Sequence, residues 1–186
     1  MIRGSGRVAR WSVALGLGLV VGACSLGGPT DPPSLALGTP VTVEHTDVGS
    51  DAGTPTTTLE VTVVEVREGT HAELAEHFVI DPEDEGDVPW YVDVRWENQG
   101  SAAIDRRLRV SMEDGDGNLI SATSIIDLGD TPFELCPRTE EGPLEPGEAV
   151  ETCTFFVLDA DRAPARVSFL PYNPGSETDF IYWAIP

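Results

Sequence analysis

The segment Asp114-Gly-Asp116-Gly-Asn118 has the residue types and the spacing that begin a calcium-binding loop. Carboxylate and amide oxygens at alternate positions are ligands that calcium prefers. A complete loop would also need a glycine where the chain has Leu119 and a glutamate where it has Ile125. The same residue types are typical of a β-hairpin turn, because Gly, Asp and Asn tolerate positive φ. We therefore expect a turn here, with weak calcium binding as the alternative.

A second acidic segment, residues 81–87, contains five carboxylates in seven positions. Packed carboxylates can hold a hard cation at the roughly millimolar concentrations found outside cells. A solvated loop is the other interpretation, because charged residues also keep strand edges from pairing with other chains. Divalent-cation binding through acidic loops is therefore an alternative function, and no resident cofactor is expected.

The histidines do not form a metal-binding or catalytic pattern. His71 and His77 are six positions apart, which does not place them on one helical face, and His45 is distant in sequence. The chain has no Gly-x-Ser-x-Gly, no Ser-x-x-Lys and no His-Glu-x-x-His sequence. We expect no enzymatic activity. A hydrolase of the cell envelope that uses a pair of acids is the remote alternative.

The N-terminus has the features of an export signal. Arg3, Arg7 and Arg10 precede an uncharged, mostly apolar run over residues 11–23. This run is shorter than the roughly 20 apolar residues that a membrane-spanning helix needs. It ends in Val-Gly-Ala-Cys, which resembles the bacterial lipobox, and the resemblance implies cleavage before Cys24 and lipidation of its thiol. An ordinary signal peptide with an incidental cysteine is the alternative.

With Cys24 assigned to the lipid, Cys136 and Cys153 remain as an even pair in an exported, oxidising setting. The segment between them is rich in Gly, Pro and Glu, whose turns can bring its ends together. We predict a disulfide, which would stabilise the fold by roughly 3 kcal/mol in the chain-entropy model. A metal site or a redox-active pair is the minor alternative, since there is no Cys-x-x-Cys spacing and no histidine nearby.

Two pairs of adjacent aromatic residues fall within predicted strands, Trp90 with Tyr91 and Tyr182 with Trp183. Adjacent strand residues face opposite ways, so one member of each pair is expected to point outward. Exposed aromatic rings can stack on sugars or anchor a protein partner, although packing at a sheet edge is an equal alternative. We take Trp90 and Trp183 as the candidate binding aromatics.

The elements that must position these residues are mainly strands. Apolar and polar residues alternate at Leu59–Val63, Val92–Trp96 and Leu108–Met112, which is the period of half-buried strands. Further strands are predicted at 119–126, 149–158, 165–169 and 179–185, and one short helix at 70–78. Short strands separated by Gly-, Pro- and Asp-rich turns are typical of an antiparallel β-sandwich. The predicted core consists of Val92, Val94, Trp96, Leu108, Val110, Phe156, Leu158, Val167, Phe169, Phe180 and Tyr182, with Trp96 at its centre.

The chain is thus predicted to have three parts. Residues 1–23 form a lipoprotein signal peptide, and residues 24–57 form a lipidated N-terminus with a flexible linker rich in Gly and Pro. Residues 58–186 form the sandwich domain. The fold class is all-β, an antiparallel immunoglobulin-like β-sandwich behind the cleaved signal and the tether.

Three motifs, in this order, resemble those of a known family. They are the strand and turn Tyr91–Gly100, the acidic glycine turn Glu113–Asn118, and Leu144–Glu148, which leads into the strand of Cys153. Together they resemble the small immunoglobulin-like (telokin-like) domains of exported lipoproteins from high-GC Gram-positive bacteria, a family of unknown function. The resemblance extends over residues 59–185. It implies an immunoglobulin-like fold and brings no catalytic residues.

The charge of the chain limits its partners. Its 186 residues contain 32 acidic residues and 11 basic ones, all arginine, for a net charge of −21. Loss of the signal, with its three arginines, would leave eight and a charge of −24. Because such an acidic surface repels phosphate backbones, we expect no nucleic-acid binding. We expect a lipid-anchored, extracytoplasmic, non-catalytic binding or structural module of the cell envelope, held to the membrane by its N-terminal lipid. Its partner is expected to be an envelope protein or wall polymer.

Overall fold

The structure is a computed structural model that describes residues 32–48, 54–78, 86–123, 133–137, 139, 142–175 and 179–186. The predicted signal peptide, Cys24 with its lipobox, and acidic residues 81–85 lie outside the described residues. Within the part described, no helix has the length and apolar character needed to cross a membrane.

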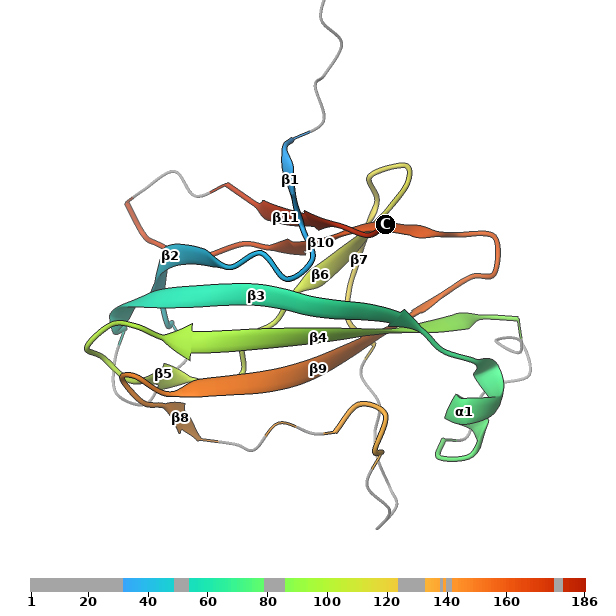
Figure 1. The fold of residues 1–186 in the computed structure, drawn as a ribbon, viewed down its shortest axis with the longest axis horizontal. Helices are drawn as coiled ribbons and strands as arrows, with labels where there is room; N and C mark the ends of the chain where they lie inside the picture. The colour runs from blue at the N-terminus through green and yellow to red at the C-terminus, as the bar shows by residue number, and fades with distance from the viewer. Residues whose placement is uncertain are drawn as a thin grey trace, which may run out of the picture. The chain divides into compact units, whose positions relative to one another are not determined.

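The first sheet consists of four antiparallel strands in the order β2-β3-β4-β9 (Figure 1). Their bounds are Val41–Thr46 for β2, Thr56–Glu68 for β3, Val88–Asn98 for β4 and Ala149–Leu158 for β9. The predicted alternation is present in β3, where Leu59, Val61 and Val63 are fully buried. The register against β4 shifts between Val63 and Glu65. This bulge leaves Val64 exposed, and after it Val66 again packs against the core.

The second sheet has the order β1-β11-β10-β6-β7. Its strands are β1 (Ser34–Ala36), β11 (Ile181–Ala184), β10 (Pro164–Phe169), β6 (Ser111–Asp114) and β7 (Leu119–Ile120). Every pair is antiparallel except β1 with β11, which is parallel. A third, small sheet joins β5 (Ile104–Asp105) to β8 (Pro143–Leu144). Helix α1 (His71–Ala75) begins with a capping box between Thr70 and Glu73, close to the predicted helix.

The two larger sheets enclose one hydrophobic core, which confirms the prediction of an all-β, mainly antiparallel sandwich. Trp96 of β4 is fully buried and meets the ring of Phe169 in β10 edge-on, with the centroids 5.1 Å apart. Its Nε1 donates a hydrogen bond to Oγ1 of Thr152 at 2.8 Å, so the indole carries no unpaired donor into the core. Trp96 therefore joins the sheets as expected.

The prediction of a flexible linker over residues 24–57 is wrong where β1 and β2 form. The compact unit begins at Pro32, not at residue 58. Leu35 and Val43 pack against the core, and Gly38, with φ of +79°, lets the chain turn from one sheet to the other. Prolines and glycines around the short apolar segment of β1 concealed that strand in the sequence, whereas Val41–Val43 did have the character of a short strand.

The inward face of β11 also differs from the prediction. Trp183 is fully buried opposite Val167, and its Nε1 donates to the carbonyl oxygen of Thr39 at 2.9 Å. Tyr182 is only half-buried and Phe180 is 38% exposed, so neither lies in the core as predicted. Strand β11 has only four residues, and all of them are apolar or aromatic. Its sequence therefore does not reveal which alternate residues face the core.

The end of β4 is fixed by the side chain of Asn98, which is fully buried. Its Oδ1 accepts hydrogen bonds from Oγ1 of Thr57 at 2.6 Å and from the backbone N–H of Gly100 at 3.1 Å. Its Nδ2 donates to the carbonyl oxygens of Ala102 at 2.8 Å and Leu144 at 2.9 Å. One amide thus joins β3, β4, β8 and the turn after β4 with all of its bonding capacity used.

We expect Asn98→Ala to lower the free energy of unfolding by about 3 kcal/mol, because it leaves several buried polar groups without partners. Denaturation in urea would measure this. Gln99→Ala is the matched control, since the Gln99 amide bonds to Glu60 at the exposed surface. We expect the control to change stability by less than about 0.5 kcal/mol. Equal effects of the two substitutions would contradict the role given to Asn98.

Candidate functional site

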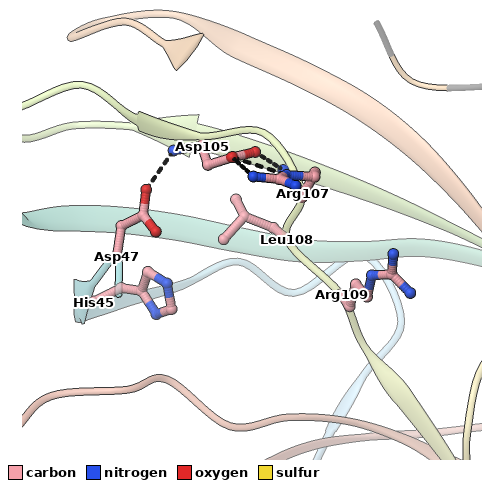
Figure 2. Close-up of a pocket in the computed structure, with 6 residues that line it drawn as sticks. All are labelled: His45, Asp47, Asp105, Arg107, Leu108 and Arg109. Atoms are coloured by element: carbon pink, nitrogen blue, oxygen red, sulfur yellow. Dashed lines mark hydrogen bonds and ion pairs between the residues drawn. The ribbon is translucent and has the colours of Figure 1, made fainter. Parts of the chain in front are cut away.

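An open pocket of about 360 Å³ lies at β5, the strand paired with β8, to which Asn98 is bonded. This volume is within the ~300–1,000 Å³ range of small-molecule sites. Figure 2 shows the six lining residues, which are His45, Asp47, Asp105, Arg107, Leu108 and Arg109. They come from the end of β2, the loop after it, β5 and the irregular segment 106–110.

The irregular segment 106–110 gives the pocket its basic rim. The sequence predicts a strand from Leu108 to Met112, but strand pairing begins only at Ser111. Arg106 instead holds the segment to β8, because its Nε donates to the carbonyl oxygen of Pro143 at 2.8 Å and its guanidinium pairs with Glu148. The predicted alternation survives without the strand, with Val110 buried and Arg107 and Arg109 exposed.

His45 is held as a neutral imidazole at one side of the pocket. Its Nδ1 accepts a hydrogen bond from the backbone N–H of Tyr172 at 3.2 Å, and its ring lies 5.9 Å from that of Phe169. An accepting Nδ1 leaves the proton on Nε2. Burial lowers the pKa of His45, against the raising effect of Asp47. The ring therefore offers a neutral N–H donor near pH 7.

The two carboxylates of the pocket support its walls. Asp47 Oδ2 accepts from the backbone N–H of Asp105 at 2.8 Å, which joins the loop after β2 to β5. Asp105 accepts from both the backbone N–H and the Nε of Arg107, each at 2.8 Å. The hydrogen bond from the Arg107 side chain is the main cause that lowers the pKa of Asp105. Both acids are thus engaged in holding the backbone of the site.

Arg109 differs from the other arginines that the structure describes. Each of those has a carboxylate partner, namely Asp93 for Arg67, Glu97 for Arg95, Glu148 for Arg106, Asp105 for Arg107, Asp114 for Arg162 and Glu113 for Arg166. Within the described ranges, Arg109 alone has none. Arg109 is exposed and lines the pocket together with Leu108. Figure 2 shows Leu108 between His45 and Arg109.

The calcium-like segment forms the turn between β6 and β7. Asp114 Oδ1 accepts from the backbone N–H groups of Asp116 at 3.0 Å and Asn118 at 2.8 Å. Its Oδ2 accepts from Asn118 Nδ2 at 3.0 Å and from Arg162 at 2.6 Å. Gly117, with φ of +80°, completes the turn. The carboxylate that would be the first metal ligand is therefore occupied by protein donors.

No cluster of metal-ligating side chains occurs among the residues whose placement is described. Asp114, Asp116 and Asn118 thus form the expected turn, in which both carboxylate oxygens of Asp114 accept hydrogen bonds from the hairpin and Arg162. The alternative of weak calcium binding by these residues stays a prediction. Of the other acidic segment, only residues 86 and 87 are described.

The predicted disulfide between Cys136 and Cys153 is present, with the two Cα atoms 5.1 Å apart. It joins segment 133–137 to β9 across the outer face of the first sheet. Phe133 of that segment packs edge-on against Phe78 and Phe155, with centroids 5.1 Å and 6.3 Å away. The bond therefore holds a small aromatic cluster over the sheet and does not border the pocket.

Of the two tryptophans chosen as binding aromatics, Trp183 is part of the core. Trp183 is fully buried, as described above, so it cannot contact a ligand. Trp90 is half-buried against the core, and its Nε1 is inaccessible to solvent. The prediction that Trp183 points outward was wrong, because β11 directs Trp183 into the core and Tyr182 away from it. Among described residues, the more exposed rings are Tyr172, at 46%, and Phe180, at 38%.

Sequence reasoning missed the pocket. Its members lie in two segments of the sequence, 45–47 and 105–109, that only the tertiary fold brings together. One signal was present in the sequence: three of the eight arginines outside the predicted signal fall within residues 106–109. In so acidic a chain, that cluster marks a local change of charge.

Comparison with known proteins identifies a shared fold but no family. No family model matches the chain, and no curated protein matches it. The solved structure of the secreted protein MPT63 from Mycobacterium tuberculosis is 17% identical, with a TM-score of 0.50, over 83% of this chain and 98% of that one. At this identity the likeness shows the fold alone.

Two other solved structures are less similar. A putative lipoprotein from Bacillus subtilis is 15% identical, with a TM-score of 0.46, over 68% of this chain and 36% of that one. An uncharacterized β-sandwich protein from Clostridium difficile is 12% identical, with a TM-score of 0.47, over 86% of this chain and all of that one. The resemblance to telokin-like domains stays a prediction.

The hairpin turn predicts how stability depends on pH. The hydrogen bonds from Asn118 and Arg162 hold the pKa of the Asp114 carboxyl well below its usual range. Because folding lowers this pKa, the bonds stabilise the fold above an unfolded-state pKa of ~3.9, and this stability is lost as pH falls further. We expect the free energy of unfolding to drop below about pH 4, and Asp114→Asn to make that drop smaller.

Urea denaturation at several pH values between neutral and about pH 3 would measure this. Asp116→Asn is the matched control, since it removes the same charge from an exposed position of the same turn. The control is expected to retain the wild-type pH profile. An unchanged profile in Asp114→Asn would contradict the assignment.

Proposed function

We propose that the protein is a lipid-anchored, extracytoplasmic, non-catalytic binding module of the cell envelope, and that the pocket around Leu108 is its ligand site. The observation that carries the proposal is the division of roles within the pocket. Asp47 and Asp105 hold backbone in place, whereas His45, Leu108 and Arg109 present a donor, an apolar surface and a charge.

The state of the polar groups favours binding over hydrolysis. A general base must have a lone pair within reach of the proton that it removes. His45 uses its accepting nitrogen on the Tyr172 N–H, and both oxygens of Asp105 accept from Arg107. The side chain of Arg107 lowers the pKa of Asp105, whereas the general acid of glycoside hydrolysis needs a raised pKa.

The proposed location rests on the sequence of the N-terminus. The basic start, the short apolar run and the lipobox-like Val-Gly-Ala-Cys24 support export followed by lipidation. A disulfide is compatible with an oxidising compartment. The similar fold of a secreted mycobacterial protein is also compatible with this location.

Intact mass spectrometry of the mature protein from membranes would test the anchor. We expect a chain that begins at Cys24 and carries the added mass of acyl groups. Stable anchoring requires more than one acyl chain, at ~0.8 kcal/mol per buried methylene. On reduction, we expect a gain of two hydrogens from the Cys136–Cys153 bond. An uncut or unacylated chain would contradict the anchor, and Cys24→Ala should release the protein from membranes.

Binding to envelope material would test the role of the pocket. The chain from Ser25 onward, immobilised, is expected to retain a component of solubilised envelope or wall fractions. We expect the double substitution Arg107→Glu with Arg109→Glu to reduce retention by about tenfold or more, as the loss of charge-assisted hydrogen bonds predicts.

Arg67→Glu with Arg95→Glu is the matched control, because it reverses two charges on the outer face of β3 and β4. Surface ion pairs of this kind contribute at most about 1 kcal/mol to stability, so the control should fold and bind. Retention of nothing by the unaltered chain, or equal losses in both double variants, would contradict the proposal.

A further inference from the structure

We infer that the pocket binds the terminal carboxylate of a peptide, with Arg109 as the ligand of the carboxylate and Leu108 as the contact for the last side chain. This inference rests on the proposed function, because it names the ligand class of the same site. It adds the orientation in which the ligand lies in the pocket, and it names Arg109 as the residue that recognises the ligand.

The pocket contains two arginines and two aspartates, so it is neutral as a whole, and its attraction for an anion depends on Arg109. The charge of Arg107 is matched by Asp105, and Asp47 lies near enough to His45 to affect its titration. Among the described residues, Arg109 is the one arginine without a carboxylate partner. A guanidinium presents parallel N–H donors that match the two oxygens of a carboxylate. One such group suits one carboxylate.

The surrounding charge disfavours a polyanion. Outside the predicted signal the chain carries a formal charge of −24, so an extended anionic polymer would lie over an acidic surface. A single carboxylate needs only the local field of Arg109, since exposed charges beyond about 8 Å are largely screened at physiological salt. The site can therefore accept a small anion in an acidic domain.

The order of groups across the pocket matches the end of a peptide. Arg109 is at one end, the apolar side chain of Leu108 is in the middle, and His45 is at the other (Figure 2). A C-terminal residue has the same order of chemistry: a carboxylate, a side chain, and then an amide carbonyl. That carbonyl is an acceptor for the proton on His45 Nε2, which the Tyr172 bond to Nδ1 keeps in place.

The test uses N-acetyl-alanyl-alanine, in its L,L and D,D forms, and the corresponding carboxamides. Each is titrated into ¹⁵N-labelled chain from Ser25 onward, and the imidazole and arginine Nε resonances are followed by NMR. We expect the free acid to bind with a Kd of roughly 1 mM, as for other ligands of this size, and to shift the His45 and Arg109 resonances. The carboxamide should bind at least about tenfold more weakly.

The two enantiomeric forms separate two sources of the same group. Preference for the L,L form would indicate the end of a protein chain, and preference for the D,D form would indicate a peptide built from D-residues. Inorganic phosphate and methyl phosphate serve as further probes. Tighter binding of either one than of both dialanine acids would overturn the assignment to a carboxylate.

Arg109→Gln is expected to weaken binding of the free acid by about tenfold and to leave binding of the carboxamide unchanged. Arg109→Lys should bind between these limits, because it keeps the charge but loses the paired donors. Arg95→Gln is the matched control, since it removes an equal charge from the outer face of β4. Arg109 is exposed, so its substitution should leave the fold intact.

Equal binding of acid and carboxamide, or unchanged binding in Arg109→Gln, would overturn the inference. So would the absence of binding by either dialanine acid at about 20 mM, well above the expected Kd. The proposed function has a separate outcome. If envelope fractions are still retained through the pocket while the dialanine probes fail, the ligand class is wrong and the binding module stands. If both fail, both are wrong.

Discussion

The four hydrogen bonds of the Asn98 side chain are the constraint on which the rest of this structure depends. A buried amide is costly unless every donor and acceptor has a partner. Asn98 meets this condition only when β3, β8 and the turn after β4 come together. Gly100 is required in that turn, since a Cβ there would lie 2.1 Å from Oγ1 of Thr57 and 2.7 Å from the backbone nitrogen of Thr58. The position of β5, and through it the rim of the pocket, follows from this arrangement.

The use of arginine in an acidic chain explains where a ligand can be recognised. Most described arginines are paired with carboxylates, and several of these pairs are partly buried, such as Arg166 with Glu113. Such pairs position strands and lessen repulsion between acids, but they leave little positive charge for partners. A single unpaired guanidinium then has more influence on specificity than it would in a basic protein. The acidic surface thus restricts the ligands that Arg109 can attract.

The long strands could be predicted because their alternation continues over many residues. β3, β4 and β9 have ten or more residues each, so their buried faces were evident, as was Trp96 at the centre. Short strands lack this redundancy. β11 allowed either Tyr182 or Trp183 inside, and β1 resembled linker. The pocket could not be predicted, because proximity of His45 to Leu108 depends on tertiary contacts and not on spacing. The calcium-like turn was ambiguous until the bond from Arg162 to Asp114 was known.

The parallel pairing of β1 with β11 limits the order in which the domain can form. Ser34, Leu35 and Ala36 lie opposite Tyr182, Trp183 and Ala184, so the first described strand pairs with the last (Figure 1). In a chain that emerges N-terminus first, β1 has no strand to pair with until nearly every other residue has emerged. The contacts around Trp183, including its bond to Thr39, must wait equally long. Strand β1, the first described strand to emerge, is therefore among the last to acquire its native neighbours, and the loop that it closes is among the longest the fold contains.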